Sequence, residues 1–119
     1  MTSIERPRRV RSETDKQTVA CGNIYITVGY SKDGKPLEVF INGSKRGGCR
    51  ANQEAIGRLV SALLRHGLFE DAKKQLAGLI CPSCQRWKGE MKREDRGNYP
   101  SSCGDAVIRA LLPEEETKC

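Results

Sequence analysis

Three cysteines near the end of the chain have a spacing that could support chemistry. Cys81 and Cys84 stand in the stretch CPSC, and Cys103 follows in SSCGD. Thiolates spaced like the CPSC pair can bind one zinc ion, because a tight turn directs both sulfurs to the same side. The same thiols could instead form a redox dithiol or part of a disulfide framework.

Composition narrows these possibilities. The chain has 119 residues, of which 37% are hydrophobic, so we expect one domain with a modest core that a metal ion would usefully supplement. No apolar stretch approaches the roughly 20 residues of a membrane helix, and the N-terminal stretch is too charged for a signal peptide. We therefore expect a cytoplasmic protein, whose thiols are kept reduced, and this disfavours a disulfide framework.

Hydrophobic patterns predict the elements that position these thiols. The runs IYITVGY and LEVFI flank Asp33-Gly34 and predict a β-hairpin. A helix is expected from about Asn52 to His66, with an apolar stripe at Ile56, Leu59, Val60, Leu63 and Leu64.

A shorter helix is expected over LFEDAKKQLAGLI, with Phe69, Ala72 and Leu76 facing inward and Gly78 closing it. A polar loop over residues 85–100 and a last helix in SSCGDAVIRALL, which Pro113 terminates, complete the prediction.

These elements predict an α+β fold, with a small antiparallel β-hairpin or sheet packed against two to three helices. A zinc knuckle would join the C-terminal helix to the sheet. We expect a flexible basic arm over residues 1–12, the folded domain over 13–112 and a flexible acidic tail over 113–119.

The position of Cys103 favours a thiolate. If Ser102 caps the last helix and Asp105 completes a capping box, Cys103 is the first helical residue, where the helix dipole stabilises negative charge. A closed zinc site needs a fourth ligand. The remaining candidates are Cys21, Cys49, Cys119 and His66.

Cys21 is the favoured fourth ligand, because it immediately precedes the first hairpin strand and is followed by Gly22. Cys49 is placed in a glycine loop, Cys119 ends the tail, and His66 is interpreted as a residue of the helix end. Four thiolates would give a structural site with no open position for a substrate.

The redox interpretation stays open. Redox CxxC pairs usually open a helix after a strand, whereas CPSC follows a predicted helix. A redox protein would pass electrons between Cys81, Cys84 and a partner reductase, with Cys119 as a relay on the tail.

Several motifs together resemble the TSCPD domain family. They are CGNIYITV, DGKPLEVFI, a glycine-rich turn, ANQEAIGRLVSALLRHG, QLAGLICP and Ser101-Ser102-Cys103-Gly104-Asp105. Ser101 replaces the threonine of the family motif and Gly104 replaces its proline. The family's cysteine pattern falls on Cys21, Cys81 and Cys103.

The resemblance implies an accessory domain like that of adenosylcobalamin-dependent ribonucleotide reductases, here in free-standing form. A complete reductase needs a large barrel and a cofactor site that do not fit in this chain. We therefore expect a non-catalytic zinc-binding protein of deoxynucleotide and DNA metabolism, which binds a nucleotide, a nucleic acid or a partner such as a reductase. A free-standing inhibitor or decoy of a partner protein is a further alternative.

Basic and aromatic residues could make these contacts. The net charge of +6 permits association with phosphate groups, and Lys45, Arg46 and Arg50 lie in and after the glycine-rich turn. Trp87 and Tyr99 could stack on bases, although packing within their own loop is the favoured interpretation. No pairing of a nucleophile with a base predicts an activity of the chain's own.

Overall fold

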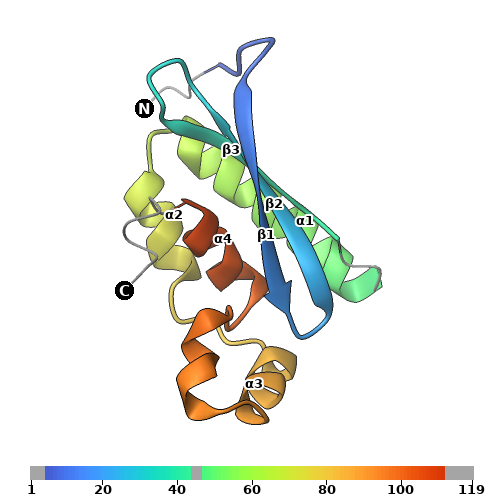
Figure 1. Cartoon of the computed structure of the whole chain (residues 1–119). Helices are drawn as coiled ribbons and strands as arrows, with labels where there is room; N and C mark the ends of the chain where they lie inside the picture. The colour runs from blue at the N-terminus through green and yellow to red at the C-terminus, as the bar shows by residue number, and fades with distance from the viewer. Residues whose placement is uncertain (1–4, 44–46, 112–119) are drawn as a thin grey trace.

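The computed structural model describes residues 5–43 and 47–111 of the chain. In order along the chain, these residues form three strands, one long helix, two short helices, a 3-10 helix and a final helix (Figure 1). A three-stranded sheet packs with several helices, so the predicted α+β class is confirmed.

The sheet is antiparallel, with strand order β1-β2-β3. Strand β1 spans Arg11–Val19, β2 spans Gly22–Tyr30 and β3 spans Pro36–Asn42. β2 and β3 form the predicted hairpin, and Gly34 in its loop has a φ of 83°, which glycine adopts without strain. Sequence reasoning missed β1, because the polar run RSETDKQTV has no alternating apolar face.

One face of the sheet supplies most of its apolar core residues. Val28 lies opposite Val39 in the β2–β3 register, and both side chains are buried together with Ile26. Burying a side chain of this size contributes about 1.5–3 kcal/mol. Because successive side chains alternate between faces, the outer face carries Tyr25 and Phe40, and both are exposed.

Helix α1 spans Gly47–Arg65 and therefore begins earlier than the predicted start near Asn52. Its C-terminal end has the hydrogen bonds of a Schellman motif, in which the Leu68 N–H donates to the Leu63 carbonyl at 2.9 Å. Gly67 has a φ of 76° there, as this motif requires.

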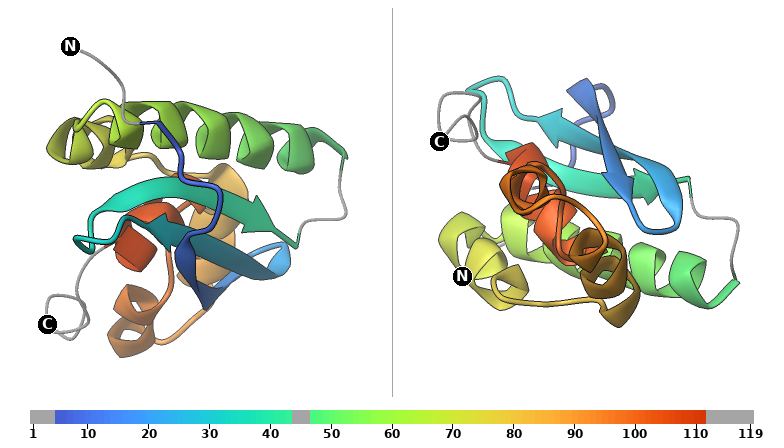
Figure 2. Two further views of the ribbon diagram at one scale, coloured as in Figure 1. Left: turned by 90° about the horizontal axis from the view of Figure 1, so that it is seen from above. Right: turned by 60° about the horizontal axis from the view of Figure 1, so that its bottom comes forward.

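α1 lies along β3, whereas the last helix packs against β2 and β1 (Figure 2). The hydroxyl of Ser61 accepts a hydrogen bond from the Val39 N–H at 2.9 Å and donates to the Val39 carbonyl at 3.2 Å. Val60 and Leu64 enter the core, but Leu59, a member of the predicted apolar stripe, is 67% exposed. Leu59 instead lines a groove between α1 and α2.

Helix α2 spans Phe69–Leu76, and Ala72 and Leu76 are buried as predicted. Gly78 follows the helix with a φ of 79°. The phenyl ring of Phe69 is half-buried against the core and lies 4.8 Å from the Lys73 ammonium.

The polar loop predicted for residues 85–100 is wrong. Helix α3 spans Pro82–Gly89 and a 3-10 helix, η1, spans Arg93–Asn98. Periodicity could not reveal these elements, because Cys84 is the one buried residue of α3 and η1 has none. Helix α4 then spans Cys103–Leu111, as predicted.

Some predictions lie outside the described residues: Lys45, Arg46 and the tail with Cys119. Within the described ranges, no helix is both long and apolar enough to cross a membrane.

Candidate metal centre

The two cysteine motifs are joined through their backbones. The Cys81 N–H donates to the Ser101 carbonyl at 2.8 Å. The Lys88 ammonium strengthens this junction, donating to the Ser101 hydroxyl at 3.1 Å and to the Tyr99 carbonyl at 2.8 Å. CPSC and SSCGD therefore lie side by side, although a helix and a 3-10 helix separate them in sequence.

CPSC opens α3. Cys81 is its N-cap, Pro82 occupies the first turn, and the side chain of Cys84 is buried one turn along. Proline suits this position, because it lacks the N–H that the first turn would leave unpaired. The Cys81 thiol is half-buried. The backbone amides of Cys84 and Ser83 approach its sulfur and lower the pKa of the thiol, although the sulfur makes no helix-capping hydrogen bond of regular geometry.

The environment of Cys84 is more apolar. Burial raises the pKa of the Cys84 thiol, while the backbone amide of Ala20 acts in the opposite direction. Negative charge on Cys81 or Cys103 would raise this pKa further, so the three sulfurs are close enough to interact electrostatically.

Cys103 is the first residue of α4, and a hydrogen-bonded cap precedes it. The Ser102 hydroxyl accepts from the Asp105 N–H at 3.0 Å, and the Asp105 carboxylate accepts from the Ser101 N–H at 2.9 Å. The predicted capping residues are thus confirmed, with the return bond made to Ser101 instead of to Ser102.

The Cys103 thiol is half-buried, and burial raises its pKa. The amide of Gln53 donates to the Cys103 sulfur at 3.3 Å and lowers the pKa. Charge on Cys49 or Cys81 would raise it, so Cys49 also lies in the neighbourhood of this sulfur.

Cys21 and Cys49 have different settings. Cys21 is exposed at the turn between β1 and β2, whereas Cys49 is half-buried in the first turn of α1, not in a loop. Over residues 5–43 and 47–111, no three histidine, cysteine or acidic side chains already have the spacing of a bound metal ion. The zinc ligand set Cys21, Cys81, Cys84 and Cys103 therefore stays a prediction.

The aromatic residues after CPSC pack on each other. The rings of Trp87 and Tyr99 meet edge to face, with centroids 5.1 Å apart and an interplanar angle of 68°. This is the local packing that the sequence favoured over base stacking. Of the residues predicted to contact phosphate, Arg50 lies in the part of the chain that the structure describes. Its side chain is exposed, and it follows Cys49 in α1.

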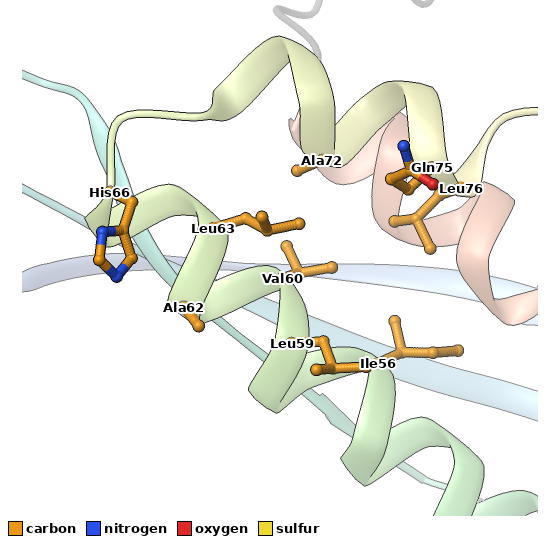
Figure 3. A pocket seen from close by; sticks show the side chains of 9 residues that line it. All are labelled: Ile56, Leu59, Val60, Ala62, Leu63, His66, Ala72, Gln75 and Leu76. Carbon is orange, nitrogen blue, oxygen red and sulfur yellow. The ribbon is translucent and has the colours of Figure 1, made fainter. Parts of the chain in front are cut away.

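An apolar groove of about 470 Å³ lies between α1 and α2. Figure 3 places the ring of His66 at one end of a row of apolar side chains. The groove is lined by Ile56, Leu59, Val60, Ala62, Leu63, His66, Ala72, Gln75 and Leu76. It holds no cysteine or carboxylate, so His66 has no partner here for metal binding or acid–base chemistry.

The fold and the neighbouring thiols define a small, cysteine-rich α+β domain. The family model of the TSCPD domain matches residues 2–113, nearly the whole chain. The chain belongs to the TSCPD domain family. No curated protein and no solved structure matches it significantly.

Proposed function

We propose that this TSCPD domain is a non-catalytic module that binds one zinc ion through Cys81, Cys84 and Cys103 together with a fourth cysteine. The ion would stabilise the fold, and the domain would act by binding a partner in deoxynucleotide metabolism. This setting comes from the resemblance to the accessory domain of cobalamin-dependent ribonucleotide reductases.

The observation that carries the zinc proposal is the backbone hydrogen bond between Cys81 and Ser101. It holds the CPSC turn against the first turn of α4, so three thiols from two motifs share one corner of the fold. Zinc favours such thiolate sets, and the backbone amides that approach Cys81 would stabilise its thiolate.

The donor chemistry also fits a structural ion. Cys84 and Cys103 lie in surroundings that favour the neutral thiol, and a coordinated zinc ion reverses this preference because its charge stabilises the thiolate. Four protein ligands close the coordination sphere, so no position remains for a substrate. The module would therefore contribute binding rather than catalysis.

Elemental analysis of protein purified without chelator tests the proposal. We expect one zinc per chain, lost together with the folded state when Cys81, Cys84 or Cys103 is changed to serine. Cys119→Ser is the matched control and should keep the ion. Absence of zinc from the folded wild-type protein would refute the proposal.

Partner binding would use Arg50, whose side chain is exposed. If the partner is a nucleic acid, a labelled single-stranded oligonucleotide should bind more weakly as salt is raised, because phosphate contacts release counterions. Arg50→Ala should weaken this binding more than Arg58→Ala, a matched change on the same helix where the arginine is paired with Glu54 at 2.5 Å. Equal effects would remove Arg50 from the interface.

A redox carrier is the second candidate, and one observation favours it: CPSC opens a helix, contrary to the sequence-based expectation. Cys81 is the more accessible thiol and Cys84 is buried. Cys81 would therefore react first: its thiolate would attack a disulfide of the partner, forming a mixed disulfide and releasing one partner thiolate. The Cys84 thiolate would then attack the Cys81 sulfur, releasing the second partner thiol and leaving a Cys81–Cys84 disulfide.

The same preparation separates the two candidates. Equilibration in glutathione buffers of graded potential, followed by peptide mass analysis, would detect a Cys81–Cys84 disulfide at cytoplasmic potentials if the pair is redox active. A tightly held zinc with no such disulfide would reject the redox carrier.

A further inference from the structure

We propose that the outer face of the sheet is a platform for single-stranded DNA, on which Tyr25 and Phe40 stack on bases and Lys16 contacts phosphate. This inference deepens the function proposed above and rests on its setting in deoxynucleotide metabolism. No cysteine belongs to the platform, so the zinc site and the platform can be tested separately.

The outer face is open to solvent. α4 packs against β2 and β1 from the side of the core, and α1 lies along β3, so no helix of the described residues covers the opposite face (Figure 2). Tyr25 is 43% exposed there and Phe40 is 56% exposed. A single exposed aromatic residue is ordinary, but two on one uncovered face indicate a surface that meets a partner.

The two rings are diagonal neighbours on adjacent strands. Phe40 lies opposite Thr27 in the β2–β3 register, and Tyr25 precedes Thr27 by two residues, so all three side chains point to one face. The α-carbons of such diagonal neighbours are about 7–8 Å apart. Rings at this separation can stack on neighbouring bases of one strand, because every base has a flat face.

Neither ring is used by a contact within the domain. Over residues 5–43 and 47–111, the close aromatic pair is Trp87 with Tyr99, and no cation lies over Tyr25 or Phe40. The aromatic residues that the sequence suggested for base stacking therefore stack on each other. The two rings of the sheet remain accessible to a base.

The charges on the outer face suit a polyanion. Lys16 is exposed and lies opposite Tyr25 in the β1–β2 register. Of the described strand residues on this face, Glu38 is the one carboxylate, and its side chain is only 5% exposed. Arg6 neutralises it, with Nε and Nη2 donating to the two carboxylate oxygens at 2.5 and 3.3 Å. Lys16 therefore gives the exposed part of the face its charge.

Arg50 lies at the same end of the sheet as Tyr25. Tyr25 pairs with Asn42, the last residue of β3, and α1 begins close to this end of the strand (Figure 1). The exposed Arg50 side chain in the first turn of α1 can thus extend the basic border of the platform.

Fluorescence anisotropy of a labelled oligothymidylate tests the two rings. Tyr25→Ala and Phe40→Ala should each raise Kd by about 5–150-fold, the loss expected for one stacked base. Leu59→Ala is the matched control, because it removes an exposed apolar side chain from α1 and should leave Kd unchanged. Far-UV circular dichroism would show that each variant is folded. Equal Kd values for the three variants would overturn the inference.

Conservative variants separate stacking from general apolar contact. Tyr25→Phe keeps a ring and should bind like the wild-type protein, whereas Tyr25→Leu keeps apolar bulk and should lose as much affinity as Tyr25→Ala. An oligonucleotide of abasic sites should bind weakly, with no further loss in Phe40→Ala. Wild-type affinity of Tyr25→Leu would refute stacking.

Salt dependence tests the phosphate contact. Lys16→Gln should reduce the slope of log K against log salt by about 0.7, the value for one phosphate on a single strand. Lys74→Gln removes an equal charge from an exposed position on α2 and should keep the wild-type slope. The same slope in both variants would overturn the assignment of Lys16.

The two proposals fail in different ways. Tyr25→Ala and Phe40→Ala should keep the zinc content of the wild-type protein. If the zinc-loaded protein binds no oligonucleotide at low salt, or binds RNA of the same sequence more tightly, the DNA platform is wrong and the zinc site stands. If folded protein without zinc binds the oligonucleotide through Tyr25 and Phe40, the platform stands and the zinc site is wrong.

Discussion

Ser61 permits a sharp prediction about stability. Its hydroxyl makes hydrogen bonds with both backbone groups of Val39, at 2.9 and 3.2 Å. Ser61 has 5% of its surface exposed and Val39 none, so water does not replace these bonds readily. Ser61→Ala should therefore leave one N–H and one carbonyl unsatisfied on β3.

The structure sets the size of the effect. An unsatisfied buried polar group costs about 1–3 kcal/mol, so two of them should lower the free energy of unfolding by about 2–6 kcal/mol. For a domain of this length, each kcal/mol corresponds to about 4 °C in Tm, which predicts a drop of about 8–24 °C. Chemical and thermal denaturation at fixed zinc concentration would measure both quantities.

Two variants control the measurement. Ser12→Ala removes an exposed hydroxyl from β1 and should change the stability by less than about 0.5 kcal/mol. Ser61→Thr keeps a hydroxyl and should recover part of the loss. The reasoning is refuted if Ser61→Ala is as stable as Ser12→Ala.

Two further predictions concern backbone strain and proton binding. Gly43→Ala should destabilise the protein more than Gly34→Ala. Both glycines have a positive φ, which costs about 1–2 kcal/mol for other residues. A Cβ at Gly43 would also lie 2.7 Å from the Asn23 carbonyl oxygen, whereas a Cβ at Gly34 would meet no atom within 4 Å. Equal losses by urea denaturation would contradict the steric argument. Burial, followed by the nearby charge of Glu13, raises the pKa of Tyr30 above its ordinary value of 10.0. The folded state therefore holds this proton more tightly than the unfolded chain, and the stability that this provides is present below pH 10.0 and lost as the pH rises through the folded-state pKa. Phenolate absorbance should show one late step that disappears in Tyr30→Phe, and a late step that persists in this variant would refute the assignment.

The accurate parts of the sequence analysis depended on local signals. Alternating apolar residues around Asp33-Gly34 specify the β2–β3 hairpin wherever the rest of the chain lies. The Ser102 and Asp105 cap likewise involves residues three apart, so it could be recognised without the fold.

The missed elements depend on distant contacts or on weak patterns. β1 is polar and becomes a strand by pairing with β2, for example where the Thr14 and Thr27 hydroxyls meet at 2.9 Å. The start of α3 did carry a signal, because Pro82 stands at the first helical position. The segment has no apolar stripe, however, so its polar composition favoured a loop. The exposure of Leu59 could not be predicted, because the stripe alone does not say which of its edges meets β3.

The candidate site likewise contains residues that local signals identify and a residue that only a distant contact reveals. Spacing identified Cys81 and Cys84, and helix capping identified Cys103. Cys49 was set aside because two glycines precede it, and glycine is a poor predictor of where a helix begins. Only the contact between Gln53 and Cys103 reveals that this part of α1 approaches the other thiols.

The position of α1 along β3 also determines where this sheet can accept another strand. With Ser61 occupying the outward backbone groups of Val39, a strand from a neighbouring molecule or domain cannot pair at that point of β3. β1 forms the opposite edge of the sheet, and its side chains from Arg11 to Lys16 are exposed. Charged edge strands resist indiscriminate pairing, so a strand docking at β1 would have to match a row that carries Arg11, Glu13, Asp15 and Lys16.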